Sequence, residues 1–178
     1  GICAAIDKKF HLGDIIVVDQ SWNGGSGKLL DTKEGETLFL PDYHHEVLDA
    51  KLKTKVTEYC NDRAFLDELS RGFGFEEGTP PSKLNLHCVD VTSVSAVTQS
   101  TKVIETLTGL ARKLGGLEME AYGVYYAARH TLEPAPVPIV IKAAADYADE
   151  HKSDNFQQYC AFISAKFAFH LIVHDLKF

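Results

Sequence analysis

The chain has 178 residues, of which 45% are hydrophobic and 24% are charged, and its formal net charge at pH 7 is -7. These values are typical of one globular domain with a substantial core. The negative charge argues against nucleic acid or an anionic membrane as a partner, because both attract clustered positive charge. The sequence contains no run of about 18 apolar residues, so no transmembrane helix is predicted.

The first residues look like the interior of a fold. The chain starts without methionine, and Gly1–Ile6 is typical of a strand end that turns through small residues. We therefore expect that an N-terminal part of the fold is missing. Ile15–Asp19 is a nearly continuous run of β-branched residues and predicts a buried strand. Residues 21–27 predict a loop that ends in Gly-Lys but lacks the glycine and the Ser or Thr of a phosphate-binding P-loop, since those positions hold Trp22 and Leu29.

Helix and strand patterns alternate through the rest of the chain. Apolar spacing predicts helices at 47–59, 63–73, 102–114 and 122–130, with Gly115–Gly116 as the C-cap of the third. Strands are predicted at 84–91 and 137–142, and a final helix starts near Ser153–Asp154. This alternation predicts a single α/β domain over residues 1–178, a three-layer αβα sandwich with a central mixed sheet covered on both faces.

Cysteine and histidine usage gives no sign of a metal site. Four cysteines lie far apart and form no CxxC pair: Cys3, Cys60, Cys88 and Cys160. We interpret them as small buried side chains in a reducing cytoplasm rather than as disulfides or metal ligands. The adjacent His44 and His45 cannot readily bind one ion from a single helix face. We therefore expect a cytoplasmic protein without a metal.

Two stretches carry candidate functional carboxylates. Glu118 and Glu120 bracket Met119 where an apolar, glycine-ended segment passes into a helical pattern. Asp146 follows the predicted strand 137–142, and open α/β sheets bind ligands at the carboxyl ends of their strands. For the two glutamates the alternative is a solvated first helical turn, which the helix dipole favours. Position alone does not decide between these interpretations.

Four stretches carry further signals: the small-residue turn and Gly-Asp strand within residues 1–19, then Ser93–Val97, Leu117–Ala121 and Ala145–Asp149. Together they resemble the nucleoside phosphorylase superfamily, most closely its branch of methylthioadenosine/adenosylhomocysteine nucleosidases. Order and spacing agree over essentially the whole chain. The resemblance implies a phosphorylase/hydrolase-like fold, of which this chain is about the C-terminal two-thirds.

The resemblance also implies an activity, which is hydrolysis of the N-glycosidic bond of a purine nucleoside with release of adenine. Such a reaction builds positive charge on the sugar and negative charge on the departing base. Asp146 would protonate the base as general acid, and Glu120 would accept hydrogen bonds from the ribose hydroxyls. The other implied substrate-binding residues are Glu118, Met119, Val97, Thr98, Cys3, Ala4 and Phe39. No cofactor is implied.

Three departures from the family pattern bear on this expectation. Ile2 stands where phosphorylases usually carry a Ser or Thr that touches phosphate, which favours water as the acceptor. Val97 stands where the nucleosidases stack a Phe on adenine, and Ala145 replaces the usual Ser before the acid. The glutamate that activates water in the nucleosidases would lie upstream of Gly1.

Family members are usually homodimers or larger homo-oligomers, in which a neighbouring subunit closes the 5′ end of the site. Leu38–Pro41 is the candidate for this contribution, and packing in the chain's own core is its alternative.

Other functions stay open. The protein could be a defence or signalling effector that cleaves AMP or ATP, with Lys28 as a candidate phosphate contact or a solvated surface charge. It could also be a phosphate-dependent phosphorylase, or a catalytically dead nucleoside sensor.

Overall fold

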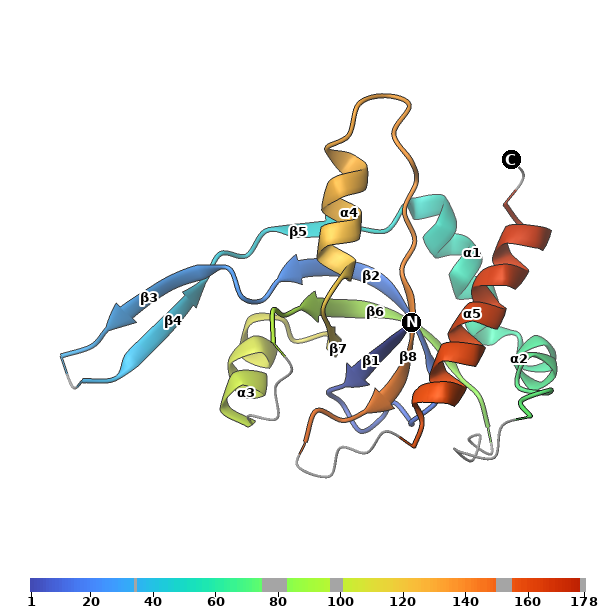
Figure 1. The fold of residues 1–178 in the computed structure, drawn as a ribbon, viewed down its shortest axis with the longest axis horizontal. Helices are drawn as coiled ribbons and strands as arrows, with labels where there is room; N and C mark the ends of the chain where they lie inside the picture. Colours follow the sequence, from blue (N-terminus) through green and yellow to red (C-terminus); the bar gives the residue numbers. More distant parts are fainter. Residues whose placement is uncertain (34, 75–82, 97–100, 150–154, 177–178) are drawn as a thin grey trace.

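A computed structural model describes residues 1–33, 35–74, 83–96, 101–149 and 155–176 (Figure 1). The strands are β1 Ile2–Ala5, β2 Ile15–Asn23, β3 Gly27–Asp31, β4 Thr37–Pro41, β5 His45–Val47, β6 Leu86–Ser93, β7 Leu114–Glu118 and β8 Ile141–Asp146. The helices are α1 Ala50–Asn61, α2 Arg63–Leu69, α3 Thr101–Leu110, α4 Ala121–Arg129 and α5 Gln157–His174. The expected α/β architecture with a mixed central sheet is confirmed.

The main sheet has the strand order β5-β2-β6-β7-β1-β8. Strands β2, β6 and β7 run parallel to one another, whereas β1 and β8 run the opposite way. Strand β8 also pairs with β2, with Ala143 opposite Ile15, so the sheet curls until these two strands meet. The curl brings the C-terminal strand back beside the N-terminal half of the chain.

Helices cover the sheet on both faces. The four consecutive β2 residues 15–18 are completely buried, which requires cover above and below the strand. Helices α1, α2 and α5 gather on one side of the sheet, and α4 packs against β2, β5 and β6 (Figure 1). Helix α5 buries an apolar stripe that includes Cys160, Ile163, Phe167 and Leu171. None of the helices in the described ranges is both long and apolar enough to cross a membrane.

Helices α1 and α2 begin at side-chain caps. The Asp49 carboxylate accepts hydrogen bonds from the backbone N–H groups of Lys51 and Leu52, and the Asp62 carboxylate accepts one from Phe65. These bonds satisfy donors that a helix start leaves unpaired. The two helices are therefore separated by a cap residue rather than by a long loop.

The predicted helix cap at Gly115–Gly116 is wrong, because both glycines lie inside β7. Helix α3 already ends at Leu110. A Cβ on Gly115 would lie 2.6 Å from Val89 Cγ2, and a Cβ on Gly116 would lie 2.9 Å from the Ala4 carbonyl oxygen. Glycine is thus required here by the close approach of neighbouring strands.

Other boundaries also differ from the sequence-based prediction, two of them near the candidate site. Strand β2 runs through Asn23, so the predicted loop at 21–27 shrinks to residues 24–26. Strand β8 begins at Ile141 rather than at residue 137, and it extends to Asp146, which was expected to follow the strand. The predicted cap at Ser153–Asp154 lies outside the described residues.

Strands β3 and β4 form a separate two-stranded ribbon that extends away from the body of the protein (Figure 1). Leu29 is 69% exposed, and Leu38 and Leu40 are 48% and 45% exposed. The alternative that Leu38–Pro41 packs into the chain's own core is therefore wrong.

Candidate functional site

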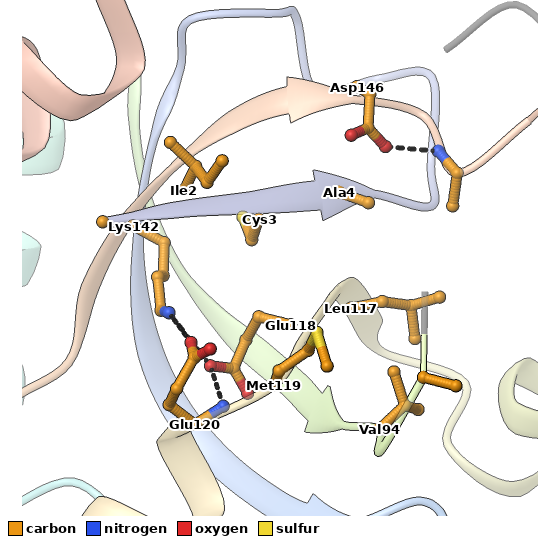
Figure 2. A pocket seen from close by; sticks show the side chains of 13 residues that line it. Ile2, Cys3, Ala4, Val94, Leu117, Glu118, Met119, Glu120, Lys142 and Asp146 are labelled. Atoms are coloured by element: carbon orange, nitrogen blue, oxygen red, sulfur yellow. Dashed lines mark hydrogen bonds and ion pairs between the residues drawn. The ribbon is translucent and has the colours of Figure 1, made fainter. Parts of the chain in front are cut away.

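A cavity of about 370 Å³ lies over β1, between the end of β7 and strand β8 (Figure 2). It is lined by Gly1, Ile2, Cys3, Ala4, Val94, Ala96, Leu117, Glu118, Met119, Glu120, Lys142, Asp146 and Ala148. Six residues expected at the site from the sequence therefore share one cavity: Cys3, Ala4, Glu118, Met119, Glu120 and Asp146.

The antiparallel arrangement of β7 and β8 sets the geometry of this cavity. Ala4 of β1 pairs with Leu117 on one side and with Asp146 on the other. Because β7 and β8 run in opposite directions, the Glu118–Glu120 segment and Asp146 do not share one edge of the sheet. Figure 2 shows Glu120 beside Lys142 at one end of the cavity and Asp146 toward the other. Lys142 and Asp146 are four positions apart on β8, and the pairing of β8 with β1 shifts register between them.

Glu118 is a fixed part of the cavity wall. It is 5% exposed, so the solvated-turn alternative is wrong for this residue. Its Oε2 accepts hydrogen bonds from the backbone N–H groups of Glu120 and Ala121, each at 2.8 Å, and its Oε1 accepts one from the Ser93 hydroxyl. The Ser93 oxygen in turn accepts a bond from the Tyr122 N–H at 2.9 Å. This carboxylate thereby satisfies donors at the start of α4.

Lys142 is a functional candidate that the sequence analysis missed. It is 7% exposed, and its Nζ lies 2.5 Å from Glu120 Oε2 and 3.1 Å from Glu118 Oε2. Burial alone would lower the pKa of this ammonium, but the hydrogen bonds and charges of the two carboxylates outweigh burial and raise it. A signal was present in the sequence, since a charge inside an apolar run such as 137–145 must find a partner when buried.

Glu120 projects into the cavity from the N-cap position of α4, where its side chain makes no capping bond. The side chain is 63% exposed. The hydrogen bond from Lys142 lowers the pKa of the Glu120 carboxyl below its ordinary value, against a smaller opposing effect of burial. Glu120 therefore presents an ionised carboxylate to the cavity.

Asp146 is oriented by the turn that follows β8. Its Oδ1 accepts a hydrogen bond from the Ala148 N–H at 2.8 Å, and Ala148 has a φ of 53°. A left-handed conformation is uncommon for a residue other than glycine, and such residues gather at functional sites. The turn places both Asp146 and Ala148 in the cavity wall.

The remaining expected residues differ in their positions. Met119 is 48% exposed and lines the cavity, whereas Cys3 is buried there and burial raises the pKa of its thiol. Val97 and Thr98 lie outside the described residues, although Val94 and Ala96 of the same segment line the cavity. Phe39 lies on the projecting ribbon and does not line the cavity of its own chain.

Within the described ranges, no three His, Cys, Asp or Glu side chains are grouped as a metal site would require. The rings of the adjacent histidines pack against different tyrosines, His44 against Tyr122 and His45 against Tyr43.

A cavity of this size in a mixed α/β sheet, lined by apolar groups and a few convergent charges, is typical of sites at which proteins bind small molecules. The family follows from the sequence. The chain belongs to the Phosphorylase superfamily, because the profile of that family matches residues 1–174.

Solved structures share the fold. Futalosine hydrolase of Helicobacter pylori has 18% sequence identity and a TM-score of 0.68, covering 97% of this chain and 65% of that chain. A 5′-methylthioadenosine/S-adenosyl homocysteine nucleosidase of the same organism has 18% identity and a TM-score of 0.66, with the same coverage. The corresponding nucleosidase of Colwellia psychrerythraea, solved in complex with adenine, has 15% identity and a TM-score of 0.67, covering 97% of this chain and 64% of that chain.

A curated relative, the uncharacterized protein y4jS of Sinorhizobium fredii, is 31% identical over 173 residues. The match covers 97% of this chain and 41% of y4jS. The present chain thus spans about two-thirds of the solved structures and less than half of this relative.

Proposed function

We propose that the protein hydrolyses the N-glycosidic bond of a purine nucleoside of the methylthioadenosine or adenosylhomocysteine type and releases adenine. The observation that carries this proposal is the placement of Glu120 and Asp146 at opposite ends of one cavity. Four positions on β8 separate Lys142, beside Glu120, from Asp146, which leaves room for a ligand with a sugar at one end and a base at the other. The 5′-methylthioadenosine/S-adenosyl homocysteine nucleosidases and the futalosine hydrolase among the solved structures with this fold support it.

The chemistry assigns a role to each end. Asp146 donates a proton to the departing purine, so that the base leaves neutral, and its bond from Ala148 holds the carboxyl in position. Glu120 accepts hydrogen bonds from the ribose hydroxyls and stabilises the positive charge that develops on the sugar. The exposed Met119 side chain packs under the ribose between them.

The charges around the cavity favour water over phosphate as the acceptor. The described lining contains three carboxylates, Glu118, Glu120 and Asp146, and one cationic side chain, Lys142, which is already paired with two of them. Such a lining repels a phosphate anion. Ile2, which also lines the cavity, offers no hydroxyl to phosphate. The same charges disfavour AMP and ATP, and Lys28 lies exposed on β3, outside the lining.

The exposed apolar side chains of the β3–β4 ribbon are evidence for a homodimer. Residues that face each other across the ribbon point the same way, so one face carries Leu30, Leu38 and Leu40 and the other carries Leu29 and Phe39. A two-stranded ribbon with apolar side chains on both faces is only marginally stable in water alone. A second copy of the chain covers it, and Phe39 closes the 5′ end of the neighbouring cavity. The free cysteines support a cytoplasmic location.

The test is a product assay. Purified protein is incubated with methylthioadenosine, adenosylhomocysteine, adenosine, AMP or ATP, with and without phosphate, and the products are separated by chromatography. Hydrolysis predicts free adenine from a nucleoside without phosphate, and Asp146→Asn lowers the rate by about 10²–10⁴-fold. Release of ribose phosphate from AMP or ATP would identify a nucleotide-cleaving effector. A requirement for phosphate would identify a phosphorylase. Binding in calorimetry without turnover would identify a sensor. Full activity of Asp146→Asn would refute the role given to this residue.

The dimer is tested separately by analytical ultracentrifugation. Leu38→Lys places a charge on one apolar face of the ribbon, and Lys33→Glu, near its tip, serves as a surface control. We expect the first variant to sediment as a monomer and the control to behave like the wild type. A wild-type protein that is monomeric at assay concentrations would exclude the second copy.

A further inference from the structure

We infer that Tyr147 is a positioning residue for Asp146, because its hydroxyl fastens the turn that follows β8 to the loop between β1 and β2. The inference rests on the proposed function, in which Asp146 protonates the departing base. Tyr147 follows Asp146 directly in the sequence, but it is not among the described residues that line the cavity. It therefore acts through Asp146 rather than on the ligand.

The end of β8 is irregular just before Asp146. Adjacent residues of β1 pair with Ala144 and with Asp146, so Ala145 is an extra residue on β8. An irregularity of this kind redirects the side chains beside it. Ala145 itself is buried, and its methyl group makes no hydrogen bond that could fix the strand end. Strand pairing alone therefore does not set the direction of the Asp146 carboxyl.

The turn that follows Asp146 is strained. Ala148 has a φ of 53°, in the left-handed region that residues other than glycine rarely adopt. Within the turn, the Ala148 N–H donates a hydrogen bond to Asp146 Oδ1 at 2.8 Å (Figure 2). A strained backbone conformation persists only where the surrounding structure enforces it. The bond between Ala148 and Asp146 therefore depends on an anchor outside the turn.

Tyr147 provides this anchor. Its hydroxyl donates a hydrogen bond to the Phe10 carbonyl oxygen at 3.0 Å, and its side chain packs against the hydrophobic core. Burial and the charge of Asp14 raise the pKa of Tyr147, so the hydroxyl keeps the proton that it donates. The bond joins residues that are 137 positions apart in the chain, and it thus restrains the turn from a separate part of the fold.

The loop that carries Phe10 is itself firmly held. Phe10 is 2% exposed, and its N–H donates to the Asp7 carbonyl oxygen at 3.0 Å. Asp14, at the end of the loop, is completely buried. Its carboxylate accepts hydrogen bonds from the backbone N–H groups of His11 and Asn85. The acceptor for the Tyr147 hydroxyl is consequently a fixed point.

The same loop is also bonded to β8 ahead of Asp146. The Gly13 N–H donates to the Ala144 carbonyl oxygen at 2.8 Å, and the Ala144 N–H donates to the Asp14 carbonyl oxygen at 2.9 Å. One loop thus holds the strand at Ala144, before Asp146, and holds the turn at Tyr147, directly after it. Loss of the Tyr147 hydroxyl removes the second attachment and lets the strained turn relax.

The experiment removes the hydroxyl and relieves the strain in separate variants. Tyr147→Phe deletes only the hydroxyl. Ala148→Gly relieves the strain, because glycine adopts a positive φ without a steric penalty, and a double variant combines both changes. Tyr59→Phe is the matched control. The Tyr59 hydroxyl donates to Asp175, and neither of these two residues lines the cavity.

Two readouts are measured on every protein. Release of adenine from methylthioadenosine gives kcat and KM. Amide hydrogen exchange, followed by NMR, gives the protection of the N–H groups of residue 148 and of Gly13. The first N–H reports on the turn, and the second reports on the attachment of the loop to β8. Thermal melting shows that each variant is folded.

We expect Tyr147→Phe to lower kcat by about 10-fold, as the loss of one hydrogen bond implies, and to leave KM within about twofold of the wild type. Exchange of the Ala148 N–H should accelerate by about the same factor, whereas exchange of the Gly13 N–H should not change. In the Ala148→Gly background the loss of the hydroxyl should change kcat by less than about threefold, because the strain is already relieved. Tyr59→Phe should keep the wild-type kcat and exchange rates.

An unchanged kcat in Tyr147→Phe, or an equal loss in Tyr59→Phe, would overturn the inference. A loss of the same size with and without Ala148→Gly would also overturn it, and would show an ordinary structural tyrosine. If the wild type cleaves no nucleoside, the proposed function fails, while exchange of the Ala148 N–H still decides whether Tyr147 holds the turn. If the wild type is active but this exchange does not respond to Tyr147→Phe, the inference fails and the proposed function stands.

Discussion

Replacing Gly116 by alanine should destabilise the protein by driving β1 away from β7. A Cβ at position 116 would lie 2.9 Å from the Ala4 carbonyl oxygen, a backbone atom that moves only if β1 moves. Overpacking of this kind costs about 1–3 kcal/mol of unfolding free energy. Because Ala4 also lines the cavity, the same displacement should weaken adenosine binding.

Gly123→Ala is the matched control. Gly123 lies inside α4, and a Cβ there would meet no atom within 4 Å. Alanine in a helix interior should stabilise the protein by about 0.5–1 kcal/mol. Both variants reduce the flexibility of the unfolded chain alike, so their difference of about 1.5–4 kcal/mol isolates the clash. For a chain of this length we expect melting temperatures about 3–16 °C apart by differential scanning calorimetry. Equal stability of the two variants would refute the close contact between β7 and β1.

Further expected outcomes concern the hydrogen bonds around the site. Ser93→Ala removes a donor from buried Glu118 and an acceptor from the Tyr122 N–H, and should cost about 1–3 kcal/mol in urea denaturation; an unchanged midpoint would contradict this network. Tyr125→Phe removes the buried 2.6 Å bond to the Val18 carbonyl and should cost about 1 kcal/mol in the same assay. Lys142 holds the pKa of Glu120 below 4.5, so the stability from their pair is present above pH 4.5 and is lost as the pH falls through the lowered value. Melting curves of the wild type and Glu120→Gln should therefore converge on acidification, and a constant difference between them would count against the pair.

The fold class could be predicted because its signals are local. The β-branched run 15–18 is completely buried, as a continuous apolar strand implies, and the 3.6-residue periodicity of α5 corresponds to its buried face. The Gly115–Gly116 error has a physical origin. Glycine is favoured both after a helix and where two strands approach closely. The atoms that decide between the two situations belong to Val89 and Ala4, which are distant in sequence from these glycines.

The residues that line the candidate cavity could be predicted in part, but their geometry could not. The position of Asp146 after an apolar run indicated a residue that lines the cavity, whereas the opposite directions of β7 and β8 could not be read from the sequence. Lys142 was missed because a lone charge in an apolar strand indicates that a partner exists without indicating which one. Its partners, Glu118 and Glu120, belong to another strand and helix start, so only the folded sheet shows the pairing.

The antiparallel relation of β7 and β8 also explains why this sheet suits the proposed reaction. If the two strands were parallel, their final carboxylates would lie together at one edge and would meet the same part of a ligand. With β1 between them and its small residues Cys3 and Ala4 lining the cavity, Glu120, just beyond β7, instead lies at the end of the cavity away from Asp146. A reaction that develops positive charge on a sugar and negative charge on a base needs opposite charges to be stabilised at two separated points. The directions of the strands in the curled sheet produce that separation, and Glu120 and Asp146 provide the carboxyl groups at its two ends.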